Sequence, residues 1–291
     1  MKPEWSDSCL NSTMPFPFND FMKDKFSAND RSDFQLDPLQ ETYHESIAEN
    51  PFHLKSLEAR DAALLTIDMQ YLDAAPGFGV FSDAHKSGVP LEAQEYYFKR
   101  LKEVVIPNVS RLQKTFRQHQ LEVIHTRIQS MTKDGRDRGA GHKRLGLHAA
   151  PGSKEAEFLP EVAPYGDEII INKTSSGVFP TTNLYYILKN IGVRALFVTG
   201  VYTNECVSST IREACDLGFH VSLIEDSCAT VTADLHNFTV ETLRDRYCRV
   251  ISTQEAIDEI ATHVSSQKIR DVAEFVPEDR LYRAADSAKS G

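Results

Sequence analysis

The sequence predicts a three-layer α/β fold, in which a mainly parallel sheet of about six strands lies between two layers of helices. Short runs of branched apolar residues alternate along the chain with longer segments of helical periodicity. This alternation is typical of strands joined by helical crossovers. Several of the short runs, such as AALLTI at residues 62–67 and ALFVT at residues 195–199, are almost continuously apolar. Such runs are typical of strands that are buried on both faces of a parallel sheet.

Each short apolar run is assigned to a strand because it is too short for a helix and rich in β-branched residues. The predicted strands are Ala63–Ile67, Glu122–His125, Glu168–Asn172, Ala195–Thr199, His220–Ile224 and Arg249–Ser252.

The segments between these strands show helical spacing of apolar residues. A long helix is expected over Ala93–His119, with a break or kink at Pro107, which lacks the N–H that a helix interior requires. Gly192 and Gly218 follow two of the predicted helices, where glycine is a common C-terminal cap. The other predicted helices are Asn183–Asn190, Cys206–Leu217, Ala233–Asp245 and Gln254–His263. A glycine- and charge-rich loop is expected over Lys133–Gly152.

The alternating segments define one domain over residues 56–265, with an N-terminal extension at residues 1–55 and a C-terminal tail at residues 266–291. The extension is polar and predicted to be irregular, yet it contains aromatic residues such as Trp5 and Phe16. Disordered tails usually lack aromatic residues, which favours an arm that packs on the domain or on a neighbouring subunit. A loose extension is the alternative.

Composition favours a soluble enzyme. The chain has 291 residues, a formal net charge of −10 and a pI near 5.5, without a basic patch, so no nucleic-acid partner is expected. No apolar run approaches the length of a membrane span, and no membrane partner is expected. Five cysteines are scattered without the spacing of a metal site or a disulfide framework. This usage favours a reducing compartment, and we expect a cytoplasmic protein.

Three of the predicted strands deliver a chemically useful residue at the carboxyl end: Asp68, Lys173 and Cys206. The carboxyl ends of parallel strands meet at one edge of the sheet, where active-site residues gather. Cys206 also stands at the first turn of a predicted helix, where the helix dipole lowers a thiol pKa and favours a thiolate at neutral pH. Each residue alone also has a structural explanation. Asp68 could cap the segment that follows it, Lys173 could be a solvated charge, and Cys206 could be a buried structural thiol.

Together, the segments LLTIDMQ, INKTSSGVF and TGVYTNEC resemble those of the isochorismatase-like cysteine hydrolases. The resemblance runs from about Ala62 to Ile257. It implies a Rossmann-like isochorismatase fold and a catalytic triad of Asp68, Lys173 and Cys206. The stretch SMTKDGRDRG, followed by KTSSGVFPTTNL, is most similar to the ureido-group amidohydrolases of this family, such as biuret hydrolases and ureidoacrylate amidohydrolases.

The resemblance also implies a mechanism. Cys206 would attack a planar amide or ureido carbonyl, while Asp68 moves the proton and the ammonium of Lys173 stabilises the thiolate. The backbone N–H groups of Tyr202 and Cys206 would form the oxyanion hole, beside a cis peptide bond between Val201 and Tyr202.

The loop KDGRDR at residues 133–138 is a candidate for substrate recognition. Arg136 and Arg138 can each present two N–H groups to a carboxylate or carbonyl oxygen of the substrate. The alternative is a solvated loop in which Asp134 and Asp137 neutralise both arginines. Three further residues are candidates for substrate contact. Gln70 could bind a substrate amide, Phe179 could form an apolar wall, and Tyr202 could form a wall beside the oxyanion hole.

No metal and no cofactor are expected, because the sequence lacks the Asp and His cluster with which nicotinamidases of the superfamily hold a metal. The expected partners are a small-molecule substrate and further copies of the chain in a dimer or tetramer, with the N-terminal arm at the subunit contact.

Three functions stay open at this point. The first is an amidohydrolase for a biuret- or ureidoacrylate-like compound. The second is a related hydrolase for another substrate, such as nicotinamide, an N-carbamoyl compound or the vinyl ether of isochorismate, although the last needs no cysteine. The third is a catalytically silent binding protein.

Overall fold

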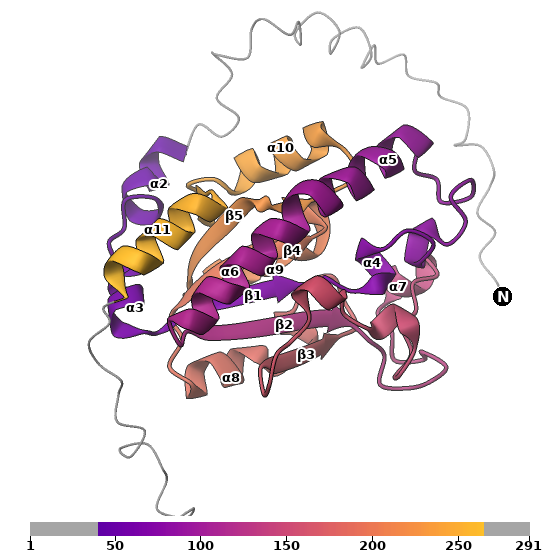
Figure 1. Cartoon of the computed structure of the whole chain (residues 1–291), viewed down its shortest axis with the longest axis horizontal. Coiled ribbons are helices and arrows are strands. Elements are labelled where there is room, and N and C mark those ends of the chain that lie inside the picture. The colour runs from indigo at the N-terminus through magenta and orange to yellow at the C-terminus, as the bar shows by residue number, and fades with distance from the viewer. Residues whose placement is uncertain (1–39, 265–291) are drawn as a thin grey trace, which may run out of the picture. The chain divides into compact units, whose positions relative to one another are not determined.

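The computed structural model describes residues 40–264. Residues 1–39 of the predicted extension and the whole predicted tail lie outside the described residues, and so do Trp5, Phe16 and the expected subunit contact of the arm. The described chain forms a six-stranded sheet of order β3-β2-β1-β4-β5-β6 in which every neighbouring pair is parallel (Figure 1). Its strands are β1 (Ala62–Ile67), β2 (Glu122–Ile128), β3 (Ile169–Lys173), β4 (Ala195–Val201), β5 (His220–Ala229) and β6 (Arg249–Ile251). The predicted fold class and all six predicted strands are confirmed.

The order of the strands reverses between β1 and β4. The chain winds from β1 outwards to β3 and then crosses back to β4, on the other side of β1. In sheets of this kind, ligands bind outside the carboxyl ends of the strands at the reversal point. Asp68 directly follows β1, and Cys206 follows β4 after a short turn, so the topology brings both residues to this point.

Helices cover both faces of the sheet (Figure 1). Ala62 and Leu64 of β1 pack with apolar side chains of α3 (Phe52–Ala59), α6 (Ile106–Gln118) and α11 (Thr253–His263). The alternate residues Ala63 and Leu65 pack on the opposite face, with side chains of α8 (Leu184–Asn190), α9 (Ser208–Asp216) and α10 (Ala233–Leu243). Because successive side chains of a strand point to opposite faces, a strand between two helical layers is largely apolar, and Thr66 is the one polar residue of β1. Every residue of β1 is buried.

The predicted long helix is interrupted, as expected from Pro107. Helix α5 (Leu91–Arg100) passes through a π-helical turn at Leu101–Val105 into α6. Proline cannot donate to the carbonyl of Glu103, four residues earlier, and a widened turn accommodates this missing hydrogen bond.

Some elements differ from the sequence-based expectation. Helix α2 (Gln40–Ile47) lies within the extension predicted to be irregular, and α3 crosses its predicted end at residue 55. Helix α7 (Ala140–Arg144) lies within the predicted loop. Strand β5 extends to Ala229 rather than Ile224, because its register with β4 shifts between Val198 and Gly200 and pairing then resumes. The remaining elements are α4 (Tyr71–Ala74) and 3₁₀ turns at Gly79–Phe81, Lys154–Ala156, Pro160–Val162 and Phe179–Thr181.

None of the helices between residues 40 and 264 has the length and apolar character that crossing a bilayer requires.

Gly200, near the end of β4, is required by both its backbone conformation and its surroundings. Its φ is +115°, and a Cβ at this position would lie 2.0 Å from the carbonyl oxygen of Ile67 on β1. We therefore expect Gly200→Ala to lower the free energy of unfolding by about 3 kcal/mol or more, measured by denaturant melts. Gly192→Ala is the matched control, since Gly192 also has a positive φ, +79°, but no atom within 4 Å of the added Cβ. Equal losses in the two variants would contradict the close approach of β4 to β1.

Candidate active site

The ammonium group of Lys173 joins the three predicted catalytic residues into one buried cluster. Its Nζ lies 2.8 Å from Oδ2 of Asp68 and donates to Sγ of Cys206 at 3.3 Å. A third hydrogen bond runs from Nζ to the carbonyl oxygen of Ser175 at 3.0 Å. The side chains of Asp68 and Lys173 are fully buried. The three donors of the ammonium are thus directed at a carboxylate, a sulfur and a carbonyl oxygen.

Asp68 is held at the end of β1 by the neighbouring strand. Its backbone N–H donates to the carbonyl of Thr126 at 3.1 Å, and the Thr126 hydroxyl approaches Oδ1 at 3.4 Å. Its φ of +52° lies in the left-handed region, which Asp tolerates better than most residues. This turn directs the chain away from the sheet and leaves the carboxylate at the sheet edge.

Lys173 reaches the cluster from two strands away. It is the last residue of β3, and β2 lies between β3 and β1, so the long side chain spans the intervening strand. Burial opposes the charge of Lys173, but Asp68 and Cys206 outweigh burial and raise the pKa of the ammonium above its usual value. Lys173 therefore stays cationic at neutral pH.

Cys206 lies in a π-helical turn, Thr203–Val207, between β4 and α9. Burial raises the pKa of its thiol well above the usual value; Lys173 lowers it, but Asp68 and Asp73 raise it further. The expected low thiol pKa is therefore wrong, because the thiol is buried and a second carboxyl group, Asp73, lies near it besides the expected Asp68. The direction of this shift favours a neutral thiol at Cys206 at neutral pH.

The turn that contains Cys206 is held by side-chain contacts with His236 and Thr230. The peptide bond between Val201 and Tyr202 is cis, as expected. The hydroxyl of Thr203 lies 2.8 Å from Nδ1 of His236 on α10, and Asn204 accepts a hydrogen bond from the hydroxyl of Thr230. The role of the Tyr202 and Cys206 N–H groups as an oxyanion hole stays a prediction.

Gln70 lies at the edge of the site, but its amide is already in use. Its Nε2 donates to the carbonyls of Ile128 and Glu155 at 2.9 and 2.8 Å, and its Oε1 accepts from the N–H of Ile128 at 2.6 Å. Both amide hydrogens are therefore directed at the backbone, and Gln70 connects the end of β2 to the loop at residue 155. These hydrogen bonds contradict the expectation that the Gln70 amide binds the substrate.

The two arginines of the loop at residues 133–138 have different environments. The Arg136 side chain is 73% exposed, and its guanidinium lies 3.1 Å from Asp134, which agrees with the solvated alternative. Arg138 is partly buried, and its guanidinium donates to the carbonyls of Gly135 and Leu147 at 3.0 and 2.6 Å. Asp137 accepts from the N–H groups of Met131 and Thr132 instead of pairing with Arg138. The loop is thus braced by its own contacts.

Phe179 and Tyr202 also make defined contacts. Phe179 stacks on Phe219 at a centroid distance of 5.9 Å and packs against the core beneath α8 and α9. The Tyr202 hydroxyl donates to the backbone carbonyl of Asp73 at 3.0 Å, and the Tyr97 hydroxyl donates to the same carbonyl at 2.9 Å. Tyr202 therefore connects the turn before the nucleophile to α4. The contacts of Phe179 assign this residue to the apolar core and correct the expectation that it forms a wall of the substrate pocket.

Two buried polar residues near the cluster escaped the sequence-based prediction. Asp73 on α4 is 2% exposed, and its Oδ2 has no hydrogen-bond partner among residues 40–264. His142 on α7 is 5% exposed with a similarly unpartnered Nδ1, and burial, followed by Lys173, lowers its pKa to about 4. The signal for Asp73 is an acid in the otherwise apolar YLDAA segment just after Asp68.

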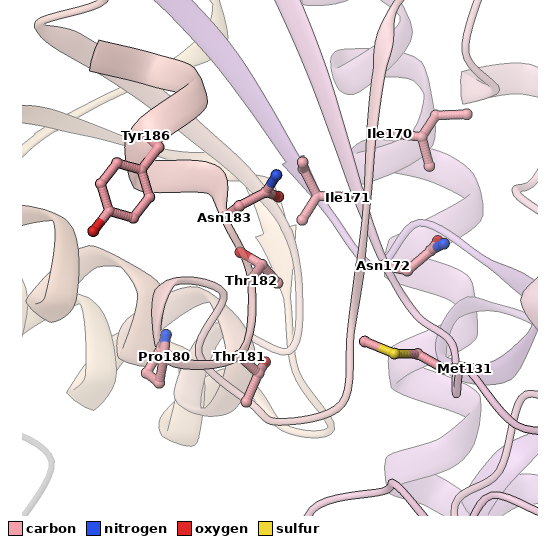
Figure 2. A pocket seen from close by; sticks show the side chains of 9 residues that line it. All are labelled: Met131, Ile170, Ile171, Asn172, Pro180, Thr181, Thr182, Asn183 and Tyr186. Carbon is pink, nitrogen blue, oxygen red and sulfur yellow. The ribbon is translucent and has the colours of Figure 1, made fainter. Parts of the chain in front are cut away.

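No three His, Cys, Asp or Glu side chains between residues 40 and 264 are grouped to hold a metal ion. A pocket of about 600 Å³ lies elsewhere, along the outer edge of β3, between Met131, Asn172 and the segment at residues 180–183 (Figure 2). Its lining includes neither Asp68, Lys173 nor Cys206.

Comparison with known proteins places these features in a family. The model of the isochorismatase domain family matches residues 62–255. An N-carbamoylsarcosine amidase from Arthrobacter is 24% identical over 160 residues, which are 53% of this chain and 61% of the amidase. The ureidoacrylate amidohydrolase RutB of Variovorax paradoxus is 34% identical over 82 residues, which are 28% of this chain and 32% of RutB. The chain thus spans less than two thirds of the length of either relative.

A solved structure confirms the fold. The cysteine hydrolase from Pseudomonas syringae pv. phaseolicola has a TM-score of 0.58 and 21% identity, covering 70% of this chain and 94% of that protein. At this identity, the similarity is one of fold.

The electrostatics of Cys206 predict the pH dependence of its alkylation. Because its thiol pKa is raised, the rate of modification by iodoacetamide should be low at pH 7 and should still be rising at the pH where an ordinary cysteine has reached its plateau. Lys173→Met removes the one neighbouring charge that lowers this pKa, so the midpoint of the rate profile should move to still higher pH. Adduct formation at Cys206 is followed by mass spectrometry.

Lys189→Met, at an exposed position on α8, is the control and should keep the wild-type midpoint. A plateau already reached below pH 7 in the wild type would contradict a neutral resting thiol.

Proposed function

This chain belongs to the isochorismatase-like hydrolase family, and on that premise we propose that it is a cysteine amidohydrolase of small ureido or carboxamide compounds. The observation that carries the proposal is the buried contact of Lys173 with both Asp68, at 2.8 Å, and Cys206, at 3.3 Å. A nucleophile, a base and a fixed positive charge in contact provide the groups that acyl transfer requires.

The first half of the proposed reaction forms an acyl-enzyme. Asp68 accepts the thiol proton of Cys206 as the sulfur attacks the substrate carbonyl carbon, and Lys173 stabilises the negative charge on sulfur. The tetrahedral intermediate then collapses, the C–N bond breaks, and Asp68 returns the proton to the departing nitrogen. Ammonia or an amine leaves, and the acyl group remains on sulfur as a thioester.

The second half regenerates the thiol. Asp68, again a carboxylate, takes a proton from water as the oxygen attacks the thioester carbonyl, and the proton then returns to the sulfur as the acid product leaves. The negative charge on the carbonyl oxygen in both halves is assigned to the N–H groups of Tyr202 and Cys206.

The relatives support a ureido compound as the substrate. N-carbamoylsarcosine and ureidoacrylate, in the names of the two relatives, both carry a ureido group. Within this class, a biuret- or ureidoacrylate-like compound is our first candidate. A silent binding protein is disfavoured, because such a protein has no use for a buried ion pair in contact with a thiol.

Ammonia release from biuret, ureidoacrylate, N-carbamoylsarcosine and nicotinamide tests the proposal. Cys206→Ala should abolish release from the best substrate, because no acyl-enzyme forms. Asp68→Asn should lower kcat by about a hundred- to ten-thousandfold, since an amide cannot carry the proton. Cys215→Ser, at a partly buried thiol on the helix that follows the nucleophile, is the matched control and should keep wild-type turnover.

Trapping of an acyl adduct on Cys206 by mass spectrometry would support the mechanism directly. Comparable turnover by Cys206→Ala would end it.

A further inference from the structure

Asp73 is a buried acid that the proposed reaction does not use. It lies on α4, the turn of helix that begins three residues after Asp68. Its side chain is buried, and its Oδ2 has no partner among the described residues. Its backbone carbonyl, in contrast, accepts hydrogen bonds from the hydroxyls of both Tyr97 and Tyr202, at 2.9 and 3.0 Å. The backbone of Asp73 is therefore fixed, while one of its carboxyl oxygens remains unsatisfied.

The charges around Asp73 are those of the catalytic cluster. Burial, followed by the negative charge of Asp68, raises the pKa of Asp73 well above its usual value, and Lys173 only partly opposes them. The other titratable groups that interact with it are Cys206 and the hydroxyls of Tyr97 and Tyr202. The direction for Asp73 favours a neutral carboxylic acid near the salt bridge of Lys173 with Asp68.

A buried carboxyl without a partner is unfavourable for folding. The position is easier to explain if a ligand supplies the missing hydrogen bond. A neutral carboxylic acid presents one O–H donor beside one C=O acceptor. An amide or ureido group presents the complementary pair, a carbonyl oxygen beside an N–H, so the two planar groups can form two parallel hydrogen bonds.

We propose that Asp73 determines substrate specificity by pairing with a second amide or ureido group of the substrate, one that is not cleaved. This inference rests on the proposed function and narrows its substrate class. The preferred substrate is then a neutral compound with two adjacent carbonyl–nitrogen groups, as in biuret. One group is presented to the thiol of Cys206, and the other is bound by Asp73.

Binding is tested in the full-length chain with the Cys206→Ala substitution, so that the result does not depend on turnover. The dissociation constant of biuret is measured by calorimetry. Asp73→Leu should weaken binding about ten- to hundredfold, because it removes both hydrogen bonds. Asp73→Asn should recover most of this loss, because a carboxamide again offers a donor beside an acceptor. Asp83→Leu, at an exposed acid before α5, is the control and should bind as the parent does.

Thermal melts separate recognition from a structural role. Asp73→Leu should raise the melting temperature, because it replaces an unsatisfied buried acid, whereas loss of a structural residue would lower it. The inference is overturned if biuret does not bind the parent protein, or if Asp73→Leu binds biuret as the parent does. The inference is also overturned if the parent protein binds guanidinium and the Asp73→Asn variant does not. That result would show that Asp73 acts as a charged carboxylate that binds a cation.

These outcomes are distinct from a failure of the proposed function. Binding of biuret that depends on Asp73, together with absent turnover of every amide by the protein with Cys206 intact, would refute the proposed activity and leave the recognition role standing.

Discussion

The ion pair between Lys173 and Asp68 is the interaction on which the site depends. Both side chains are fully buried, and either charge alone would be strongly unfavourable in this environment. The pair forms because the parallel register of β3, β2 and β1 brings the ends of these strands to one edge of the sheet. The apolar layers on both faces of the sheet exclude water from this edge. This one ion pair thus affects both the stability of the fold and the reactivity of the site. Loss of either partner leaves a buried charge without compensation.

The same burial decides how the nucleophile is activated. A lysine next to a thiol and a nearby helix N-terminus both favour a thiolate. In this site, burial and the two carboxyl groups outweigh them, and the thiol pKa rises. In the proposed reaction, Cys206 is therefore deprotonated only when a substrate is attacked, with Asp68 as the acceptor. A neutral resting thiol is also less prone to oxidation and to reaction with adventitious electrophiles.

The residues proposed to react with the substrate and the residues proposed to select it lie on different elements of the fold. In the proposed triad, Asp68 and Lys173 come from the ends of β1 and β3, and Cys206 comes from the π-helical turn after β4. The loop at residues 133–138, with its two arginines, is braced by its own carboxylates and carbonyls. Two buried polar atoms without a hydrogen-bond partner among residues 40–264, Oδ2 of Asp73 and Nδ1 of His142, lie near Lys173, on α4 and α7. Helix α4 follows β1 and α7 precedes β3, so both lie next to the strands that carry Asp68 and Lys173.

The sequence by itself determined the features that depend on local patterns. Apolar runs predicted all six strands. The positions of Asp68, Lys173 and Cys206, at or after the carboxyl ends of three strands, predicted that these residues form a site. Pro107 predicted the interruption of the long helix, because a missing N–H acts within one turn. The sequence did not predict α3, because its eight residues show only weak helical periodicity. The helix is stabilised by packing of Leu57 against side chains of the sheet and of α11. Only the tertiary structure decided the thiol pKa of Cys206, the use of the Gln70 amide by Ile128 and Glu155, and the unsatisfied carboxyl of Asp73. Each of these depends on groups far apart in the chain that only the folded sheet brings into contact.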